Sequence, residues 1–284
     1  MAEQSLMKLA AVAVVAALLT AGGMTVFGGA GAGESETEIM ITGSTTLFPI
    51  MTVFQEQYEK ETVGVSLSIS GGGSGIGINN AAAGTADIGM SSRDVRDSEK
   101  DANPDLKVHV IGYDGVAIIV GDGAGVAALT IEQVRDVFAG DISNWNEVGG
   151  NDATIVVYNR DDASGTRDAF DSLVMGDKDT KPGANIVASN GAMRTSVAGN
   201  AYGIGYVGLS FLDDSTNALD ILVDGTPVTP NAENVASEDY PIFRNLILVT
   251  DGEPTGWAKA FLEWCMQPTA QKLVASEGFV PLYE

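Results

Sequence analysis

The sequence comprises 284 residues, of which 45% are hydrophobic and 19% charged, and it contains 35 glycines spread among apolar runs. A chain of this length and composition can form one large domain or two smaller ones, so we expect a globular α/β or α+β protein. The formal net charge is −23, from 38 acidic and 15 basic residues. Because nucleic acids are bound through lysine and arginine, we expect no nucleic-acid partner.

The N-terminal part differs in composition from the rest. Residues 9–32 carry no charge, follow Lys8 and end in the small residues Ala-Gly-Ala. This pattern predicts a secretory signal peptide or an N-terminal membrane anchor, for which about 20 apolar residues suffice. The segment contains no cysteine, which excludes a lipid-modified cysteine anchor. We assign residues 1–38 to this segment and a polar spacer, and we expect the remainder to act outside the cytoplasm.

The next part of the chain alternates strands with helices. Apolar residues with period two predict strands, and apolar residues at helical spacing predict helices. A third short apolar piece, ADIGMSSRDV, ends in hydroxyl residues. The expected elements are a strand at 39–42, a helix at 47–60, a strand at 63–70, a helix at 78–86, a long β run at 108–123 and a helix at 129–140.

The pattern continues in the second half. The expected elements there are a strand at 153–160, a helix at 164–175, a long β run at 240–252 and helices at 255–267 and 269–278. Strands that alternate with helices predict a mostly parallel sheet flanked by helices. The two long β runs suggest that the chain crosses between two lobes and returns, with a cleft between them. We expect lobe one to comprise 39–115 with 245–284, and lobe two to comprise 116–244.

Three turns combine a hydroxyl residue with glycine between a strand and a helix: GSTT at 43–46, GGGSG at 71–75 and ASGT at 163–166. Helix starts carry unpaired N–H groups and partial positive charge, and glycine lets the backbone approach a ligand closely. Arg160 adds a guanidinium that can hold an oxyanion through two hydrogen bonds. One such turn is usually only a helix cap, but three turns and an arginine predict a site for a tetrahedral oxyanion.

Two carboxylates follow this arginine in the stretch RDDASGT. Beside an oxyanion, Asp161 or Asp162 would be repulsive unless it paired with Arg160 or accepted a hydrogen bond from a protonated ligand oxygen. Phosphate near neutral pH retains a proton and sulfate does not. A carboxylate in this position therefore predicts a preference for phosphate.

Other kinds of site match the sequence less well. The stretch GGGSGIG lacks the dinucleotide fingerprint, because Ile76 and Ile78 occupy required glycine positions, and it lacks the G-K-[ST] ending of a phosphate-binding loop. A hydrolase with Ser164 or Ser74 as nucleophile would lack a base, since the one histidine, His109, lies in an expected strand. No residues have metal-ligand spacing, and we expect no metal and no cofactor.

The single cysteine and the tryptophans have simpler interpretations. Cys265 lies in the apolar context FLEWCM, which is typical of a buried core residue. Trp145, Trp257 and Trp264 have apolar neighbours and are expected to pack in the core or at the surface of a domain.

Several stretches together resemble the PstS family, the phosphate-specific substrate-binding proteins of ABC transporters. They are ITGSTTLFPI, SISGGGSGIG, ADIGMSSRDV, FAGDISNWNEVGG, NRDDASGTRDAF, AYGIGYVGLS and KLVASEGFVPL. The resemblance covers nearly all of residues 39–284. It implies a two-lobed, type II periplasmic-binding-protein-like α/β fold that closes on dehydrated phosphate through a hinge.

The resemblance also implies a set of ligand-binding residues. Thr45, Thr46 and Ser74 match hydroxyl donors of the first two turns, and Asp162 matches an aspartate that orients the arginine. The predicted phosphate-binding residues are Ser44, Thr45, Thr46, Ser74, Gly75, Ser91, Ser92, Arg160, Asp162, Ser164, Gly165 and Thr166. In one respect the chain departs from the family: some relatives carry a proton-accepting aspartate where this chain has Ser92, followed by Arg93 and Asp94.

We therefore predict an extracytoplasmic receptor, without catalytic activity, that captures inorganic phosphate by lobe closure and delivers it to an ABC-transporter permease. Two alternatives remain open at this point. One is a sensor of phosphate or another oxyanion without a transport role, and the other is a phosphate-ester hydrolase that uses Ser164 or Ser74.

Overall fold

The computed structural model describes residues 37–283, and the predicted signal peptide or anchor lies outside these residues. Strand β1 (Thr37–Gly43) begins two residues before the end of the predicted spacer, so Thr37 and Glu38 belong to the fold. Within residues 37–283 there is no helix with the length and apolar character needed to cross a membrane. For the described residues we use the predicted division, extended at the start by Thr37 and Glu38: lobe one is 37–115 with 245–283, and lobe two is 116–244.

Lobe one contains strands and helices in alternation, as predicted. After β1 its elements are α2 (Phe48–Glu61), β2 (Val65–Ser70), α3 (Ser74–Ala82), β3 (Ile88–Ser91), α4 (Asp97–Ala102), α9 (Gly256–Cys265) and α10 (Pro268–Ser276). Helix α3 begins four residues earlier than the predicted helix at 78–86 and ends at Ala82. The helix starts inside the glycine-rich turn because Gly73, at φ 108°, occupies the cap position in a conformation that favours glycine.

Lobe two contains more elements than the sequence patterns predicted, chiefly between residues 176 and 239. Its helical elements are α5 (Ile131–Ala139), η1 (Trp145–Val148), α6 (Gly165–Phe170), the π-helical η2 (Asp171–Met175), α7 (Asn190–Ala198), η3 (Leu209–Phe211) and α8 (Ala232–Ala236). Its strands are β5 (Ala128–Leu129), β6 (Val156–Arg160), β7 (Asn185–Val187), β8 (Gly203–Gly208), β9 (Asn217–Ala218), β10 (Asp220–Val223) and β11 (Thr226–Val228).

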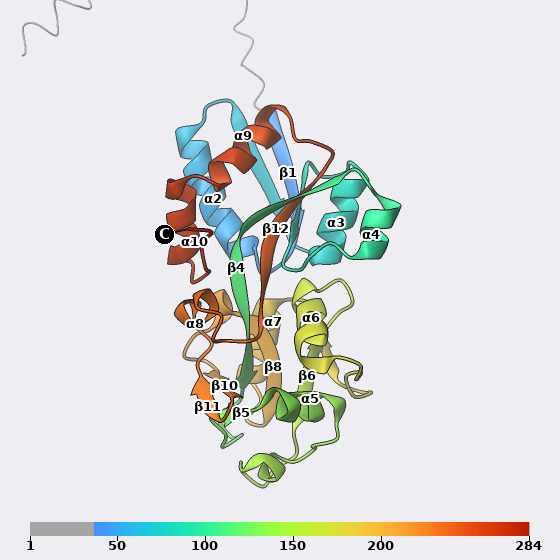
Figure 1. Cartoon of the computed structure of the whole chain (residues 1–284), viewed down its shortest axis with the longest axis vertical. Coiled ribbons are helices and arrows are strands. Elements are labelled where there is room, and N and C mark those ends of the chain that lie inside the picture. The colour runs from blue at the N-terminus through green and yellow to red at the C-terminus, as the bar shows by residue number, and fades with distance from the viewer. Residues whose placement is uncertain (1–36, 284) are drawn as a thin grey trace, which may run out of the picture. The chain divides into compact units, whose positions relative to one another are not determined.

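Two long strands join the lobes. Strand β4 (Leu106–Val120) pairs with β12 (Phe243–Asp251) along residues 106–115 and with β8 along residues 116–120. Figure 1 shows β4 and β12 side by side as they pass from one lobe to the other. The two predicted long β runs are therefore the crossing strands.

The crossing strands also connect the two halves of the main sheet, whose order is β2-β1-β3-β12-β4-β8-β6-β7, with β9 paired to β4. Strands joined through helices pair in parallel, namely β1 with β2 and β3, and β6 with β7 and β8. The crossing strands instead pair antiparallel with their neighbours β3 and β8. A second, three-stranded sheet has the order β11-β10-β5.

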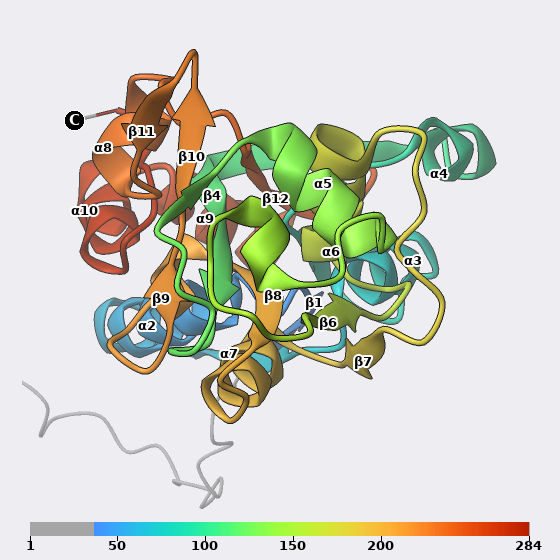
Figure 2. The same cartoon turned by 90° about the horizontal axis from the view of Figure 1, so that it is seen from below.

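Helices cover both faces of each half of the sheet. Successive strand residues point to opposite faces, so they pack against different helices. In β12, Leu248 joins the core under α2 and α9, whereas Val249 packs toward α3. In β8, Tyr206 faces α5 and α6, whereas Val207 faces α7. Figure 2 shows α5 and α6 on one side of β6 and β8, and α7 on the other.

The hydrophobic cores of the two lobes are separate. The clusters of lobe one draw on residues 39–111 and 246–279, and those of lobe two draw on residues 113–243. Two lobe-one residues are exceptions, because Val280 and Tyr113 bridge to each other and pack against the core of lobe two. The lobe boundaries remain a prediction, which this separation supports.

The cysteine and the three tryptophans lie where the sequence predicted, in the core or at the surface of a lobe. Cys265 is fully buried in the core of lobe one, and burial raises the pKa of its thiol. Trp145 and Trp264 are buried in the cores of lobes two and one, whereas Trp257 is exposed at the surface. His109 lies in β4, where its Nε2 is 3.1 Å from Thr250 Oγ1.

Close packing of α3 on the sheet gives a test of this fold. A Cβ atom at Gly77 would lie 2.5 Å from the Met90 carbonyl oxygen and 2.7 Å from that of Thr42. We expect Gly77→Ala to lower the free energy of unfolding by ~1–3 kcal/mol, because backbone atoms would have to move. Chemical denaturation measures the change.

Gly191→Ala in α7 is the matched control, since the nearest atom to its added Cβ, Ser189 Oγ, is 4.0 Å away. That substitution should stabilise the helix by ~0.5–1 kcal/mol. Equal effects of the two substitutions would contradict the packing argument.

Candidate anion-binding site

Four helix starts meet where the lobes face each other. In lobe one, the turn of residues 44–47 leads from β1 into α2, and Gly73 caps α3 after β2. In lobe two, Ser164 caps α6 after β6, and Ser189 caps α7 after β7. These connections lie at the carboxyl ends of parallel strands, which is where α/β proteins commonly bind ligands.

Three serines of lobe one form a buried group. Ser44 Oγ donates to Ser92 Oγ at 3.0 Å, and Ser74 Oγ lies 3.4 Å from Ser92 Oγ. The Ser92 N–H also donates to Ser74 Oγ at 3.0 Å. Each of the three side chains is at most 1% exposed. Two of the three predicted turns, at 43–46 and 71–75, thus bring their hydroxyls together with that of Ser92 from the ADIGMSSRDV stretch.

The lobes are in direct contact around this group. Thr46 Oγ1 of lobe one lies 3.1 Å from Thr166 Oγ1 of lobe two, and the Gly75 N–H donates to the Ala163 carbonyl oxygen at 3.1 Å. A Cβ atom at Gly165 would lie 2.1 Å from Ser74 Oγ, so only glycine fits there. These contacts between the lobes help to bury the residues of the group.

Arg160, at the end of β6, reaches into the same place. Its side chain is 1% exposed and donates from Nε to the Val187 carbonyl oxygen and from Nη2 to the Ala188 carbonyl oxygen, both at 3.2 Å. Nη2 is also 3.5 Å from Thr45 Oγ1. The other terminal nitrogen, Nη1, is buried and has no hydrogen-bond partner among the described residues.

The charge of Arg160 has no carboxylate partner either. Within residues 37–283, no Asp or Glu lies at ion-pair distance from it. Burial lowers the pKa of the guanidinium, and repulsion from Arg244 lowers it further, whereas Tyr206 and Asp161 act in the opposite direction. A buried positive charge with a free donor is unfavourable by itself, and an anion would compensate it.

Two further side chains fix the backbone of Arg160. Its N–H donates to Asn159 Oδ1 at 2.8 Å, and the Tyr206 hydroxyl also donates to this amide oxygen. The Tyr206 ring stacks on Phe170 with a centroid distance of 4.2 Å. Burial raises the pKa of Tyr206, so its hydroxyl remains a neutral donor. These contacts fix the backbone of Arg160, and the carbonyl oxygens of Val187 and Ala188 fix its guanidinium.

The prediction that Asp162 orients Arg160 is wrong for this structure. The Asp162 side chain is 95% exposed and forms an ion pair with Arg167, which also pairs with Asp171. The pair with Arg167, which lies in the first turn of α6, holds the Asp162 carboxylate at the protein surface. Asp161 is half-buried, and its Oδ1 accepts the Ala163 N–H at 3.0 Å, which fixes the turn.

Two other predicted residues have local structural partners. Ser164 Oγ accepts the Arg167 N–H at 3.2 Å and so caps α6. Ser91 Oγ donates to the Arg93 carbonyl oxygen at 2.7 Å and stays within its own turn. Ser91 therefore stabilises the loop that carries Ser92.

A buried ion pair beside the site was not predicted. Asp114 of β4 is fully buried and accepts from Arg244 of β12, with Nη2 to Oδ2 at 2.7 Å and Nε to Oδ2 at 3.1 Å. Asp114 Oδ1 accepts the Leu209 N–H at 3.0 Å. Arg244 Nη2 also donates to Thr46 Oγ1 at 3.1 Å. The pair thus links the two crossing strands to the buried hydroxyls. We call these hydroxyls the hydroxyl cluster; they belong to Ser44, Thr46, Ser74, Ser92 and Thr166.

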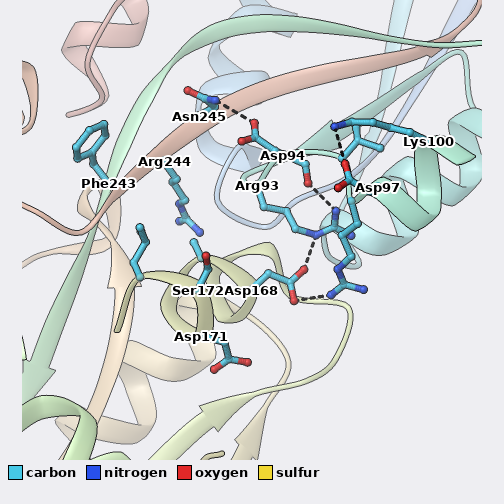
Figure 3. A pocket seen from close by; sticks show the side chains of 14 residues that line it. Arg93, Asp94, Asp97, Lys100, Asp168, Asp171, Ser172, Phe243, Arg244 and Asn245 are labelled. Carbon is cyan, nitrogen blue, oxygen red and sulfur yellow. Dashed lines mark hydrogen bonds and ion pairs between the residues drawn. The ribbon is translucent and has the colours of Figure 1, made fainter. Parts of the chain in front are cut away.

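A cavity of about 730 Å³ lies beside the cluster, lined by charged residues of both lobes. Figure 3 shows Arg93 of lobe one and Asp168 of lobe two pointing toward each other in it. Arg96 forms a second ion pair with Asp168, and Glu99 pairs with Arg93 at 2.7 Å within lobe one. Asp168 therefore connects the lobes at the edge of the site.

Comparison with known proteins agrees with this architecture. The model of the PBP superfamily domain matches residues 29–269. The phosphate-binding protein PstS of Bacillus subtilis is 31% identical over 88% of this chain and 82% of its own length. This chain belongs to the PstS family.

Solved structures place this PstS-family chain in the same fold. A Clostridium perfringens protein, described as a phosphate ABC transporter substrate-binding protein with bound phosphate, has 37% identity and a TM-score of 0.82. The match covers 87% of this chain and all of that one. An ABC-type phosphate transport receptor from Vibrio cholerae has 33% identity and a TM-score of 0.71, over 85% of this chain and 99% of its own. The two-lobed periplasmic-binding-protein-like fold predicted from the sequence is confirmed.

The buried ion pair provides a stability test. We expect Arg244→Met to lower the free energy of unfolding at pH 7 by ~3–5 kcal/mol, because Asp114 would lose its cation. Without Arg244, burial would raise the pKa of Asp114 further, since attraction to Arg244 now opposes that rise. A group with a raised folded-state pKa stabilises at low pH and loses that contribution as pH rises.

The stability deficit of Arg244→Met should therefore shrink as pH falls from 7 toward 5. Denaturant unfolding at several pH values measures it, and the double variant Arg244→Met with Asp114→Asn should remove most of the pH dependence. A deficit that is constant with pH would contradict this account of the pair.

Proposed function

We propose that this PstS-family chain captures inorganic phosphate between its lobes and delivers it to an ABC-transporter permease outside the cytoplasm. The observation that carries the proposal is the buried guanidinium of Arg160, which lies among hydroxyl donors and has no carboxylate partner within residues 37–283. Nη1 of Arg160 and Nη1 of Arg244 are both buried donors without partners among the described residues. Such donors, held by surrounding structure, suit an oxyanion.

The donor groups suit a tetrahedral anion because they come from several directions. Hydroxyls of Ser44, Ser74 and Ser92 approach from lobe one, and Thr166 approaches from lobe two. Helix starts add partial positive charge. The relatives from Bacillus, Clostridium and Vibrio are named for phosphate, which supports phosphate as the ligand.

Lobe closure is the proposed mechanism. The cluster is buried, while β4 and β12 provide continuous strands about which the lobes can rotate. Ligand binding would shift an equilibrium between open and closed forms toward a closed form in which the two lobes are in contact. The closed form would then present surfaces of both lobes to the permease.

The interatomic contacts do not favour the hydrolase alternative. Ser164 Oγ is occupied as a helix cap, and the one histidine of the sequence, His109, contacts Thr250 on β12. A nucleophilic serine requires a nearby base. We therefore propose a binding protein rather than an enzyme.

Isothermal titration of residues 33–284, stripped of ligand, tests the function. We expect tight binding of phosphate and weaker binding of sulfate in matched buffer. Arg160→Ala should weaken phosphate binding by ~3 kcal/mol or more, because truncating a buried charged partner typically costs 2–5 kcal/mol.

Arg194→Ala is the matched control, because Arg194 forms a partly exposed ion pair with Asp213 within lobe two. It should leave affinity unchanged. If neither phosphate nor sulfate binds the wild-type protein, the proposed function is wrong. If Arg160→Ala keeps near wild-type affinity, the site lies elsewhere.

Phosphate release tests the closure mechanism. We expect Asp168→Asn to speed release at least several-fold, because it removes the ion pairs of Asp168 with Arg93 and Arg96 across the lobes, and even exposed pairs contribute up to ~1 kcal/mol. Salt should accelerate release from the wild type more than from the variant, because salt screens the pair. Stopped-flow measurement at two ionic strengths gives both results.

Asp213→Asn, which removes an ion pair within lobe two, is the control and should release phosphate like the wild type. Unchanged release from Asp168→Asn at both salt concentrations would show that this contact does not stabilise closure.

A further inference from the structure

Asn190 has no part in the motifs described above, yet it touches the centre of the cluster. It is the first residue of α7 in lobe two and is fully buried. Its Nδ2 donates to Thr46 Oγ1 at 2.9 Å and to Thr45 Oγ1 at 3.2 Å, both in lobe one. The helix cap is supplied by Ser189, whose Oγ accepts the Ala192 N–H at 3.0 Å. Asn190 is therefore not needed as a cap.

The orientation of the Asn190 amide follows from its second contact. Oδ1 accepts the Gly208 N–H at 3.2 Å. A backbone N–H can only donate, so the amide oxygen must face Gly208. The NH₂ group must then face the two threonines, to which it can only donate.

This arrangement fixes the hydroxyl proton of Thr46. A hydroxyl has two acceptor positions and one proton. Thr46 Oγ1 receives hydrogen bonds from Asn190 Nδ2 at 2.9 Å and Arg244 Nη2 at 3.1 Å, and neither of these groups can accept one. The Thr46 proton must therefore point elsewhere, and Thr166 Oγ1 at 3.1 Å is its acceptor in this structure.

The same count applies to Thr45. Its Oγ1 receives Asn190 Nδ2 at 3.2 Å and a longer contact from Arg160 Nη2 at 3.5 Å. Both threonines are thus set as donors, and one amide contacts both. Since Asn190 lies in the opposite lobe from the threonines, its hydrogen bonds exist only when the lobes are closed.

We infer that Asn190 is a positioning residue: as the lobes close it occupies acceptor positions of Thr45 and Thr46 and so keeps both hydroxyls as donors, available to an anion when one binds. The inference rests on the proposed function, because it assigns a role to Asn190 in phosphate binding. It makes this part of the site donor-only, which matches the acceptor oxygens of an oxyanion.

Asn190→Asp tests the inference with a side chain of the same shape. A carboxylate only accepts, so it would draw both hydroxyl protons away from the ligand and place a negative charge beside it. We expect phosphate affinity at pH 8 to fall at least 100-fold. As pH falls toward 5.5, protonation of the new carboxyl restores a donor, so the ratio of the variant's Kd to the wild-type Kd should decrease.

Asn190→Leu removes the amide without adding charge. We expect a fall in affinity of about 10-fold, because the threonine hydroxyls could then turn in other directions. The Kd ratio of this variant to the wild type should not vary with pH. That contrast separates proton direction from a structural role, which would alter both variants alike at every pH.

Gly191→Ala is the matched control on the same helix, because an added Cβ atom there would have its nearest neighbour, Ser189 Oγ, 4.0 Å away. It should leave phosphate affinity within about 2-fold of wild type and should not lower thermal stability. Circular dichroism confirms that each variant is folded before titration. If wild-type protein does not bind phosphate, the proposed function fails. If it binds and Asn190→Asp binds within 3-fold of it at pH 8, or shows a pH-independent ratio, the role of Asn190 is wrong.

Discussion

The arrangement of the site depends on the buried positive charge of Arg160, which no carboxylate within residues 37–283 neutralises. Other buried or half-buried arginines around it have their own carboxylates: Arg244 has Asp114, Arg93 has Glu99, and Arg167 has Asp171. Within the described part of the chain, Arg160 instead donates to two backbone carbonyl oxygens, and its Nη1 has no hydrogen-bond partner there. Because burying an uncompensated charge is unfavourable, the surrounding contacts must hold it in place until an anion arrives.

An acidic protein can bind an anion because the local donors outweigh the distant charges. The net charge of −23 belongs to the whole chain, and salt screens exposed charges beyond about 8–10 Å. Donors in the buried cluster act at hydrogen-bond distance and in a medium of lower dielectric constant. Moreover, Asp162 and Asp171 are paired with Arg167, so their charge is partly compensated away from the cluster.

The parts of this structure that could be predicted from sequence are those whose signals are local. Strand, glycine-hydroxyl turn and helix follow one another along the chain, so this repeated pattern predicts that Ser44, Ser74 and Thr166 belong to one site. Asp114 and Arg244 are 130 residues apart and lie inside β runs, where no neighbouring residue indicates a pair. Asn190 follows a short strand that the periodicity did not reveal.

Local signals also misled where tertiary contacts override them. Asp162 stands two residues from Arg160, but Arg167 on the first turn of α6 takes its carboxylate. The glycine-rich turn has low helix propensity, yet α3 starts inside it. Gly77 allows the helix backbone to lie against the Met90 and Thr42 carbonyl oxygens, and that contact decides where the helix runs.

The polar character of the interlobe contacts explains how a small anion could control closure. The two lobes have largely separate hydrophobic cores, and the contacts across the site are polar; they include Thr46 with Thr166, Gly75 with Ala163, Arg93 with Asp168, and Asn190 with Thr45 and Thr46. On opening, water can replace such hydrogen bonds, so little apolar surface is exposed there. The open and closed forms then differ modestly in free energy, and a ligand that contacts both lobes only in the closed form can decide the balance. A hydrophobic interlobe interface would hold the protein closed without ligand. An anion could then not reach the buried guanidinium of Arg160.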